Sequence, residues 1–144
     1  MNASELLFPE PTPPSETDVK VVEAKIGTRL PSDYREFILK TGGGVPSESC
    51  YSNGNGINVY VQNIFTVGDP KSPIDLAKEI ISNPASRGLL KSRIPVATAN
   101  GGDYLMIHKR KGIVYLWDHE TNNVSKVCES WNDLLAGIKP DFNK

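Results

Sequence analysis

The start of the chain carries hydrophobic residues at helical spacing. Three of them fall on one face of a helix: Val19, Val22 and Ile26. Ser15 can accept a hydrogen bond from an amide of the first turn, and Asp18 stands where it completes a capping box. Gly27 suits the left-handed conformation in which many helices end. The pattern therefore predicts a helix over residues 15–26.

A second helical pattern follows directly. Pro31 lies in the first turn, where a helix does not need the missing N–H, and the glycines 42–44 end the pattern. The residues expected to be buried are Tyr34, Phe37, Ile38 and Thr41. The side chains expected to stay in water are Arg35, Glu36 and Lys40.

Two more helices are predicted later in the chain. The first begins at Ser72 and carries one hydrophobic stripe, formed by Ile74, Ala77, Ile80 and Ile81. The last begins at Ser130, with Asp133 as the partner in its capping box. It buries Trp131, Leu134, Leu135 and Ile138.

Between these helices the pattern changes to that of strands. Hydrophobic and polar residues alternate from Ile57, and the phase shifts near Gln62 and Asn63, which predicts a β-bulge within a strand over 57–67. Residues 47–56 are rich in serine, asparagine and glycine and are expected to form a loop. Four later strands are predicted at 94–99, 104–108, 113–117 and 124–127.

Short turns separate the later strands, and parallel pairs would need long crossovers. We therefore expect an α+β fold, with a curved antiparallel sheet of about five strands and helices packed on one side. Residues 15–144 are expected to form a single domain. Residues 1–14 contain four prolines and are expected to form an extended N-terminal arm.

The hairpin formed by 104–108 and 113–117 has two hydrophobic faces. Its predicted register places Tyr104 opposite Trp117 and Met106 opposite Tyr115. The other face is aliphatic and suits packing against helices; it carries Leu105, Ile107, Val114 and Leu116. The aromatic and methionine face is either covered by the N-terminal arm and the 45–56 loop, or partly open. An open face of this composition is typical of protein-binding surfaces.

Composition narrows the class of protein. The chain has 144 residues, of which 38% are hydrophobic and 23% charged, as in globular domains. Its formal net charge is −1, which argues against direct binding of nucleic acid. No hydrophobic run approaches the roughly 18–20 residues of a membrane span, and the N-terminus does not resemble a secretory signal. A cytoplasmic location is expected, with Cys50 and Cys128 as free thiols.

Asp118, His119 and Glu120 are the strongest candidates for catalysis or metal binding. A histidine between two acids could act as a base or as a ligand. However, adjacent residues of an extended segment point to alternate sides, so the three rarely converge on one atom. A solvated strand end is therefore the prediction, with no catalytic residue, metal or cofactor.

Two other polar or glycine-rich features have simpler interpretations. The glycine runs 42–44 and 101–102 do not match a phosphate-binding loop and indicate positive φ angles or close backbone approach. Residues 109–111 form the basic triplet Lys-Arg-Lys at the hairpin turn. The triplet either keeps an exposed turn soluble or binds an acidic partner.

Four segments in order resemble a known family. Residues 30–37 read Leu-Pro-Ser-Asp-Tyr-Arg-Glu-Phe, and residues 94–103 contain Ile-Pro-Val-Ala followed by Gly-Gly-Asp. Residues 114–120 end in Asp-His-Glu, and residues 130–135 read Ser-Trp-Asn-Asp-Leu-Leu. This pattern resembles the SUKH superfamily (Smi/Knr-like), which includes fungal cell-wall assembly regulators and many bacterial immunity proteins.

The resemblance implies an α+β domain that binds proteins and has no catalytic residues. In bacteria it implies an immunity protein that occludes a cognate toxin domain, such as a nuclease, without a covalent bond. The polar positions that match the family are Asp103, Asp118, His119 and Glu120; with the aromatic face they are the candidate partner-binding residues. The alternatives are a regulatory adaptor of the same fold and a hydrolase that uses His119.

Overall fold

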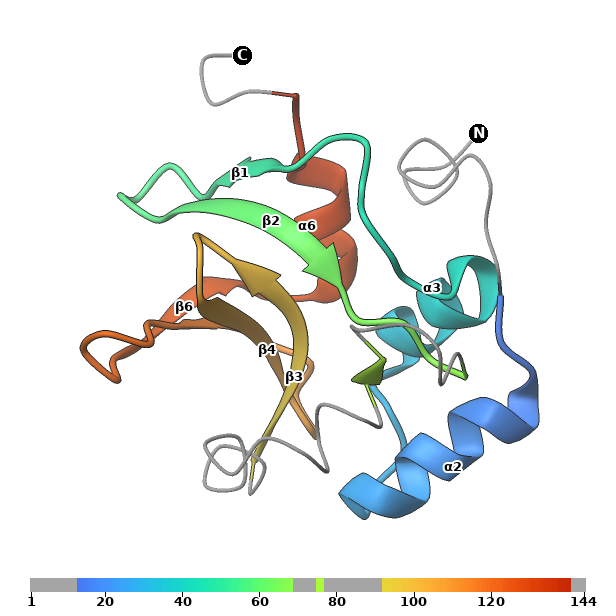
Figure 1. The fold of residues 1–144 in the computed structure, drawn as a ribbon. Helices are drawn as coiled ribbons and strands as arrows, with labels where there is room; N and C mark the ends of the chain where they lie inside the picture. Colours follow the sequence, from blue (N-terminus) through green and yellow to red (C-terminus); the bar gives the residue numbers. More distant parts are fainter. Residues whose placement is uncertain (1–12, 69–74, 77–91, 141–144) are drawn as a thin grey trace.

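The computed structural model describes residues 13–68, 75–76 and 92–140. These residues form three helices and a six-stranded antiparallel sheet in the order β1-β2-β3-β4-β5-β6 (Figure 1). The helices are α2 (Glu16–Ile26), α3 (Ser32–Thr41) and α6 (Trp131–Gly137). The strands are β1 (Cys50–Ser52), β2 (Asn58–Ile64), β3 (Arg93–Ala99), β4 (Asp103–His108), β5 (Val114–Trp117) and β6 (Val124–Cys128). The predicted α+β class is confirmed.

Strand β1 lies within residues 47–56, which the sequence predicted to be a loop. It has only three residues and owes its conformation to its neighbours, because it pairs with β2 on one side. On the other side Cys50 forms an antiparallel bridge with Lys139, beyond α6. A short strand fixed by such distant partners leaves no alternating pattern in its own sequence. The sheet therefore has one strand more than expected.

The register of the β4–β5 hairpin and the bulge in β2 follow the predictions. Tyr104 pairs with Trp117 and Met106 with Tyr115, as the hairpin pattern indicated. The pairing of β2 with β3 shifts between Val61 and Asn63, which confirms the predicted bulge. Because consecutive strands pair antiparallel, successive turns lie alternately at the two opposite ends of the sheet.

Local capping explains where α2 begins and ends. The Ser15 side chain accepts the amide of Asp18, and the Asp18 carboxylate accepts the amide of Ser15, which completes the predicted capping box. Gly27 ends the helix with a φ of 79°. Helix α3 begins just after Pro31, which occupies the N-cap position, and ends at Gly42 with a φ of 76°.

The prediction that Arg35 stays in water was wrong. Its side chain is only 8% exposed and forms ion pairs with Glu16 and Glu23 of α2. Glu23 also accepts the backbone N–H of Leu30, at 2.7 Å. The charge is buried because α3 packs against α2 at this point, and the carboxylates compensate its desolvation. Helical periodicity alone cannot reveal a partner twelve residues away.

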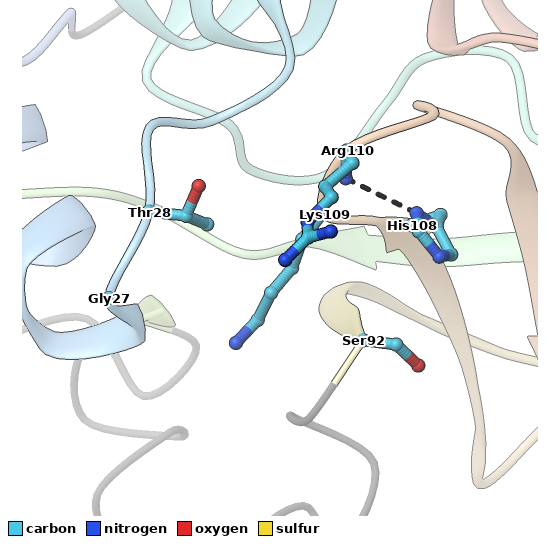
Figure 2. Close-up of a pocket in the computed structure, with 6 residues that line it drawn as sticks. All are labelled: Gly27, Thr28, Ser92, His108, Lys109 and Arg110. Atoms are coloured by element: carbon cyan, nitrogen blue, oxygen red, sulfur yellow. Dashed lines mark hydrogen bonds between the residues drawn. The ribbon is translucent and has the colours of Figure 1, made fainter.

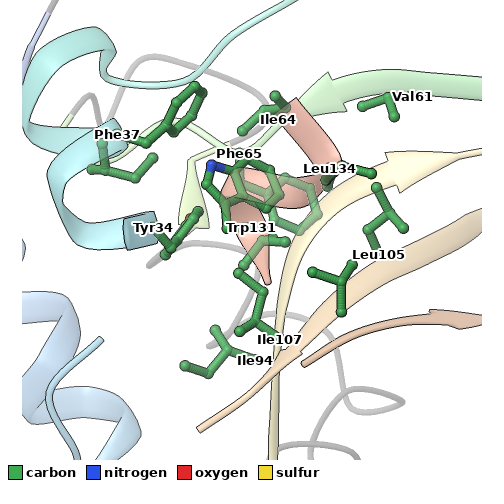
Figure 3. Packing of buried hydrophobic residues seen from close by; sticks show 14 of the residues in the cluster. Tyr34, Phe37, Val61, Ile64, Phe65, Ile94, Leu105, Ile107, Trp131 and Leu134 are labelled. Atoms are coloured by element: carbon green, nitrogen blue, oxygen red, sulfur yellow. The ribbon is translucent and has the colours of Figure 1, made fainter. Parts of the chain in front are cut away.

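The core lies between the sheet and the helices, around Trp131 of α6 (Figure 3). Trp131 is fully buried and makes edge contacts with the rings of Tyr34 and Phe37, each with 5.2 Å between ring centroids. The aliphatic side chains of the sheet face this cluster, among them Leu105 and Ile107. Aromatic pairs of this geometry add about 0.5–1.5 kcal/mol beyond their buried area.

Two predictions concern residues that the structure does not describe. The helix from Ser72 lies outside the described residues, except for Asp75 and Leu76. Leu76 is buried, and Asp75 forms a parallel bridge with Thr66. The N-terminal arm also lies outside them, apart from Pro13 and Pro14. Within the described part of the chain, no helix has the length and hydrophobicity to cross a membrane.

Candidate partner-binding site

The aromatic face of the β4–β5 hairpin is partly covered. The rings of Tyr104 and Trp117 stack with 5.4 Å between centroids and 21° between planes, and both residues are half-buried. The Arg93 guanidinium lies 4.7 Å from the centre of the Tyr115 ring, a cation–π contact. Met106 is fully buried and belongs to the core. The contact area that this face offers therefore comes from its three half-buried rings.

Asp103 and His119 join two turns of the sheet. The His119 Nδ1 lies 2.6 Å from the Asp103 Oδ1, and the same oxygen accepts the His119 backbone N–H at 3.1 Å. This hydrogen bond raises the pKa of His119 above its ordinary value, because the carboxylate favours the imidazolium. Asp103 is nearly buried, whereas 40% of the His119 side chain is exposed. One member of the pair thus supports the turn and the other faces solvent.

Gly102 makes room for this pair. A Cβ atom at this position would lie 2.9 Å from the His119 Cε1, and the residue has a φ of 156°. The neighbouring Gly101 has a φ of 82°. Both features were predicted from the glycine run, which was interpreted as positive φ or close approach. The imidazole that makes the approach comes from a turn seventeen residues later and could not be identified from the sequence.

Asp118 holds the turn between β5 and β6. Its Oδ1 accepts the amides of Glu120, at 2.8 Å, and of Thr121, at 3.3 Å. The Trp117 indole N–H donates to the Asn122 Oδ1 at 2.6 Å, and Asn122 takes a φ of 61°. Glu120 accordingly projects into solvent with 79% of its side chain exposed. The turn is ordered by its own side chains.

Two residues that the sequence analysis did not propose for the site tie β2 to the same end of the sheet. The Asn100 Oδ1 accepts the Tyr60 amide and the Gln62 Oε1 accepts the Gly101 amide, both at 2.9 Å. We call residues 100–103 and 118–123 the turn end. It lies on the side of the sheet away from α2 and α3 (Figure 1). The Asn-Gly-Gly sequence was the available signal for Asn100, since asparagine tolerates positive φ.

The chemistry open to the turn end is limited by these hydrogen bonds. Asp103, Asp118 and His119 have ligand atoms within 4.8 Å of one another and are the candidates for holding a metal ion within the described residues. Both carboxylates already accept backbone amides, and the His119 Nδ1 is bonded to Asp103. The His119 Nε2 lies 3.9 Å from the Glu120 Oε1. A hydrolase that used His119 as a base would need a nucleophile or a water molecule beside this Nε2 atom, where the Glu120 carboxylate lies instead.

The fold is thus of the α+β class, with a polar, hydrogen-bonded turn end beside half-buried aromatic rings. The model of the SMI1 / KNR4 family (SUKH-1) matches residues 13–137, and the chain belongs to this family. Over 142 residues it is 24% identical to the SPbeta prophage-derived uncharacterized protein YokK of Bacillus subtilis (strain 168). The match covers 83% of this chain and 72% of that relative.

Proposed function

We propose that this protein is an immunity protein that binds a cognate bacterial toxin domain and occludes its active site without a covalent bond. One observation carries the proposal: the turn end presents exposed polar groups on a fixed frame, next to the stacked rings of Tyr104 and Trp117. A preorganised surface loses little entropy on binding. Aromatic side chains are among the strongest anchors of protein interfaces.

The charge of the turn end suggests what kind of surface it fits. Glu120 is largely exposed, and Asp118 stands beside it with its Oδ1 engaged by the turn. An exposed carboxylate such as that of Glu120 complements the positively charged groove with which a nuclease holds a phosphate backbone. Family membership and the prophage origin of the YokK relative agree with a bacterial immunity role. On this proposal the protein acts by binding, as a cytoplasmic inhibitor, and has no catalytic activity.

The proposal is tested by co-expressing the chain with the toxin domain encoded beside its gene. We expect growth to be rescued and the two proteins to co-elute in gel filtration. Glu120→Lys should weaken the complex. Glu36→Lys is the matched control, because Glu36 is also acidic and exposed but lies on α3, away from the turn end (Figure 1), so this variant should bind normally. Failure of rescue together with absence of a complex would contradict the proposal. Capture of cellular proteins instead of the toxin would favour the regulatory adaptor.

A further inference from the structure

A cleft lies at the end of the β4–β5 hairpin opposite the turn end (Figure 2). Three segments that are far apart in the sequence form it: the end of α2, the residue before β3, and the hairpin turn at 108–110. Its volume is about 440 Å³, and its lining residues are Gly27, Thr28, Ser92, His108, Lys109 and Arg110. We call this set the basic cleft. The proposed function does not use it.

The described lining residues carry two cations and no carboxylate. The Lys109 ammonium donates to the Ile26 carbonyl at 3.0 Å and so compensates the negative end of α2. Arg110 and Lys111 are exposed. Burial lowers the pKa of His108, and the neighbouring cations Lys111, Arg93 and Arg110 lower it further. Positive charge is therefore concentrated here, although the whole chain has a formal net charge of −1.

The His108 side chain holds the hairpin turn through two hydrogen bonds. The His108 Nδ1 accepts the amides of Arg110, at 3.2 Å, and of Lys111, at 3.1 Å. These amides are consequently not directed at an anion. The helix beside the cleft also presents its carboxyl end, whereas phosphate sites use the amides of a helix N-terminus. Recognition must come from long cationic side chains and the hydroxyl groups of Thr28 and Ser92.

We propose that the basic cleft docks an acidic segment of a protein partner, with carboxylates paired to Arg110 of the cleft and to Lys111, the next residue of the hairpin turn. The carboxylates of a flexible peptide can each form an ion pair with a separate cationic side chain, so these cations need not be arranged around a single anion. A nucleic acid would need a longer basic track and a basic surplus, which this chain lacks. The inference goes beyond the proposed function, because it holds for a toxin and for a cellular partner alike.

The test is a titration that needs no toxin. A blocked hexapeptide of alternating glutamate and aspartate is added to the ¹⁵N-labelled protein, with the glutamine and asparagine peptide as the neutral probe. We expect the acidic peptide to change the amide chemical shifts of Ser92, His108 and Arg110. The affinity for the peptide should fall as the salt concentration rises from about 50 to about 300 mM. The double variant R110Q/K111Q should weaken binding about three- to tenfold, in line with exposed ion pairs.

Lys40→Gln is the control for the loss of a single exposed positive charge elsewhere on the surface. It removes one exposed charge from the last turn of α3, whereas the hairpin turn lies beside the start of that helix, where Gly112 approaches Pro31. Equal binding of the neutral peptide, or equal weakening by Lys40→Gln, would overturn the proposal. So would saturation by inorganic phosphate, or preference for a single-stranded DNA oligonucleotide. If the protein rescues growth from the toxin but does not bind the peptide, only this inference is contradicted. If it binds the peptide but does not rescue growth, only the proposed function is contradicted.

Discussion

The imidazole of His119 is held 2.6 Å from the carboxylate of Asp103, across two turns that are sixteen residues apart. Asp103 is nearly buried and also accepts the His119 amide, so it fixes both the ring and the backbone. Asp118 plays a similar part within its own turn. Of the four polar positions for which the sequence resemblance predicts a role, Asp103 and Asp118 therefore support the turns. The other two, His119 and Glu120, have the more exposed side chains.

The pairing predicts how stability depends on pH. Since Asp103 raises the pKa of His119 above 6.5, the folded state binds this proton more tightly than the unfolded state. The stabilisation is complete below about pH 6.5 and is lost as the pH rises through the folded-state pKa. Urea unfolding of the wild type and His119→Gln between about pH 5 and 9 measures it. The difference in unfolding free energy should shrink as the pH rises; a constant or growing difference would contradict the pairing.

A second prediction concerns two glycines with nearly the same backbone angle. Gly27 and Gly43 have φ values of 79° and 80°, but only Gly43 is crowded: a Cβ there would overlap the Phe65 carbonyl oxygen. Gly27→Ala should cost about 1–2 kcal/mol for the left-handed conformation alone. Gly43→Ala should cost about 1–3 kcal/mol more, because a backbone atom must move. Equal losses in urea unfolding would show that the crowding is relieved without cost.

The third prediction tests the buried charge of α3. Arg35→Met should lower the free energy of unfolding by about 3 kcal/mol, because Glu23, with 12% of its side chain exposed, loses its cation. The double variant R35M/E23Q should recover part of this loss, because the carboxylate that then stays without its cation, Glu16, has 52% of its side chain exposed. Lys40→Met is the control, as Lys40 is exposed on the same helix. If both single variants lose the same stability, the ion pairs contribute little.

These examples show which features a sequence can predict in this fold. The ends of α2 and the β4–β5 register depend on neighbours within a few residues, and both were predicted correctly. Strand β1 and the burial of Arg35 depend on contacts with distant segments, and both were missed. The candidate surfaces likewise differ in how far the sequence could predict them. Glycine and acid patterns marked the turn end, but the lining of the basic cleft comes from three segments that only the fold brings together.

The last prediction separates inhibition by binding from inhibition by catalysis. An immunity protein that occludes a toxin must be present in equal amounts, so half an equivalent should leave about half of the toxin activity when the complex is tight. His119→Gln removes a half-exposed side chain, and we expect it to weaken binding without changing the stoichiometry.

A hydrolase that used His119 would behave differently. It would inactivate an excess of toxin over time, and His119→Gln would abolish that effect while leaving binding intact. Toxin activity is therefore measured against time at several molar ratios, with Glu36→Lys as the control for charge. The Asp103–His119 pair orients an imidazole as catalytic pairs do, but its Nε2 faces the Glu120 carboxylate at 3.9 Å. That arrangement favours a contact surface over an activated nucleophile, and stoichiometric, time-independent inhibition is the result we expect.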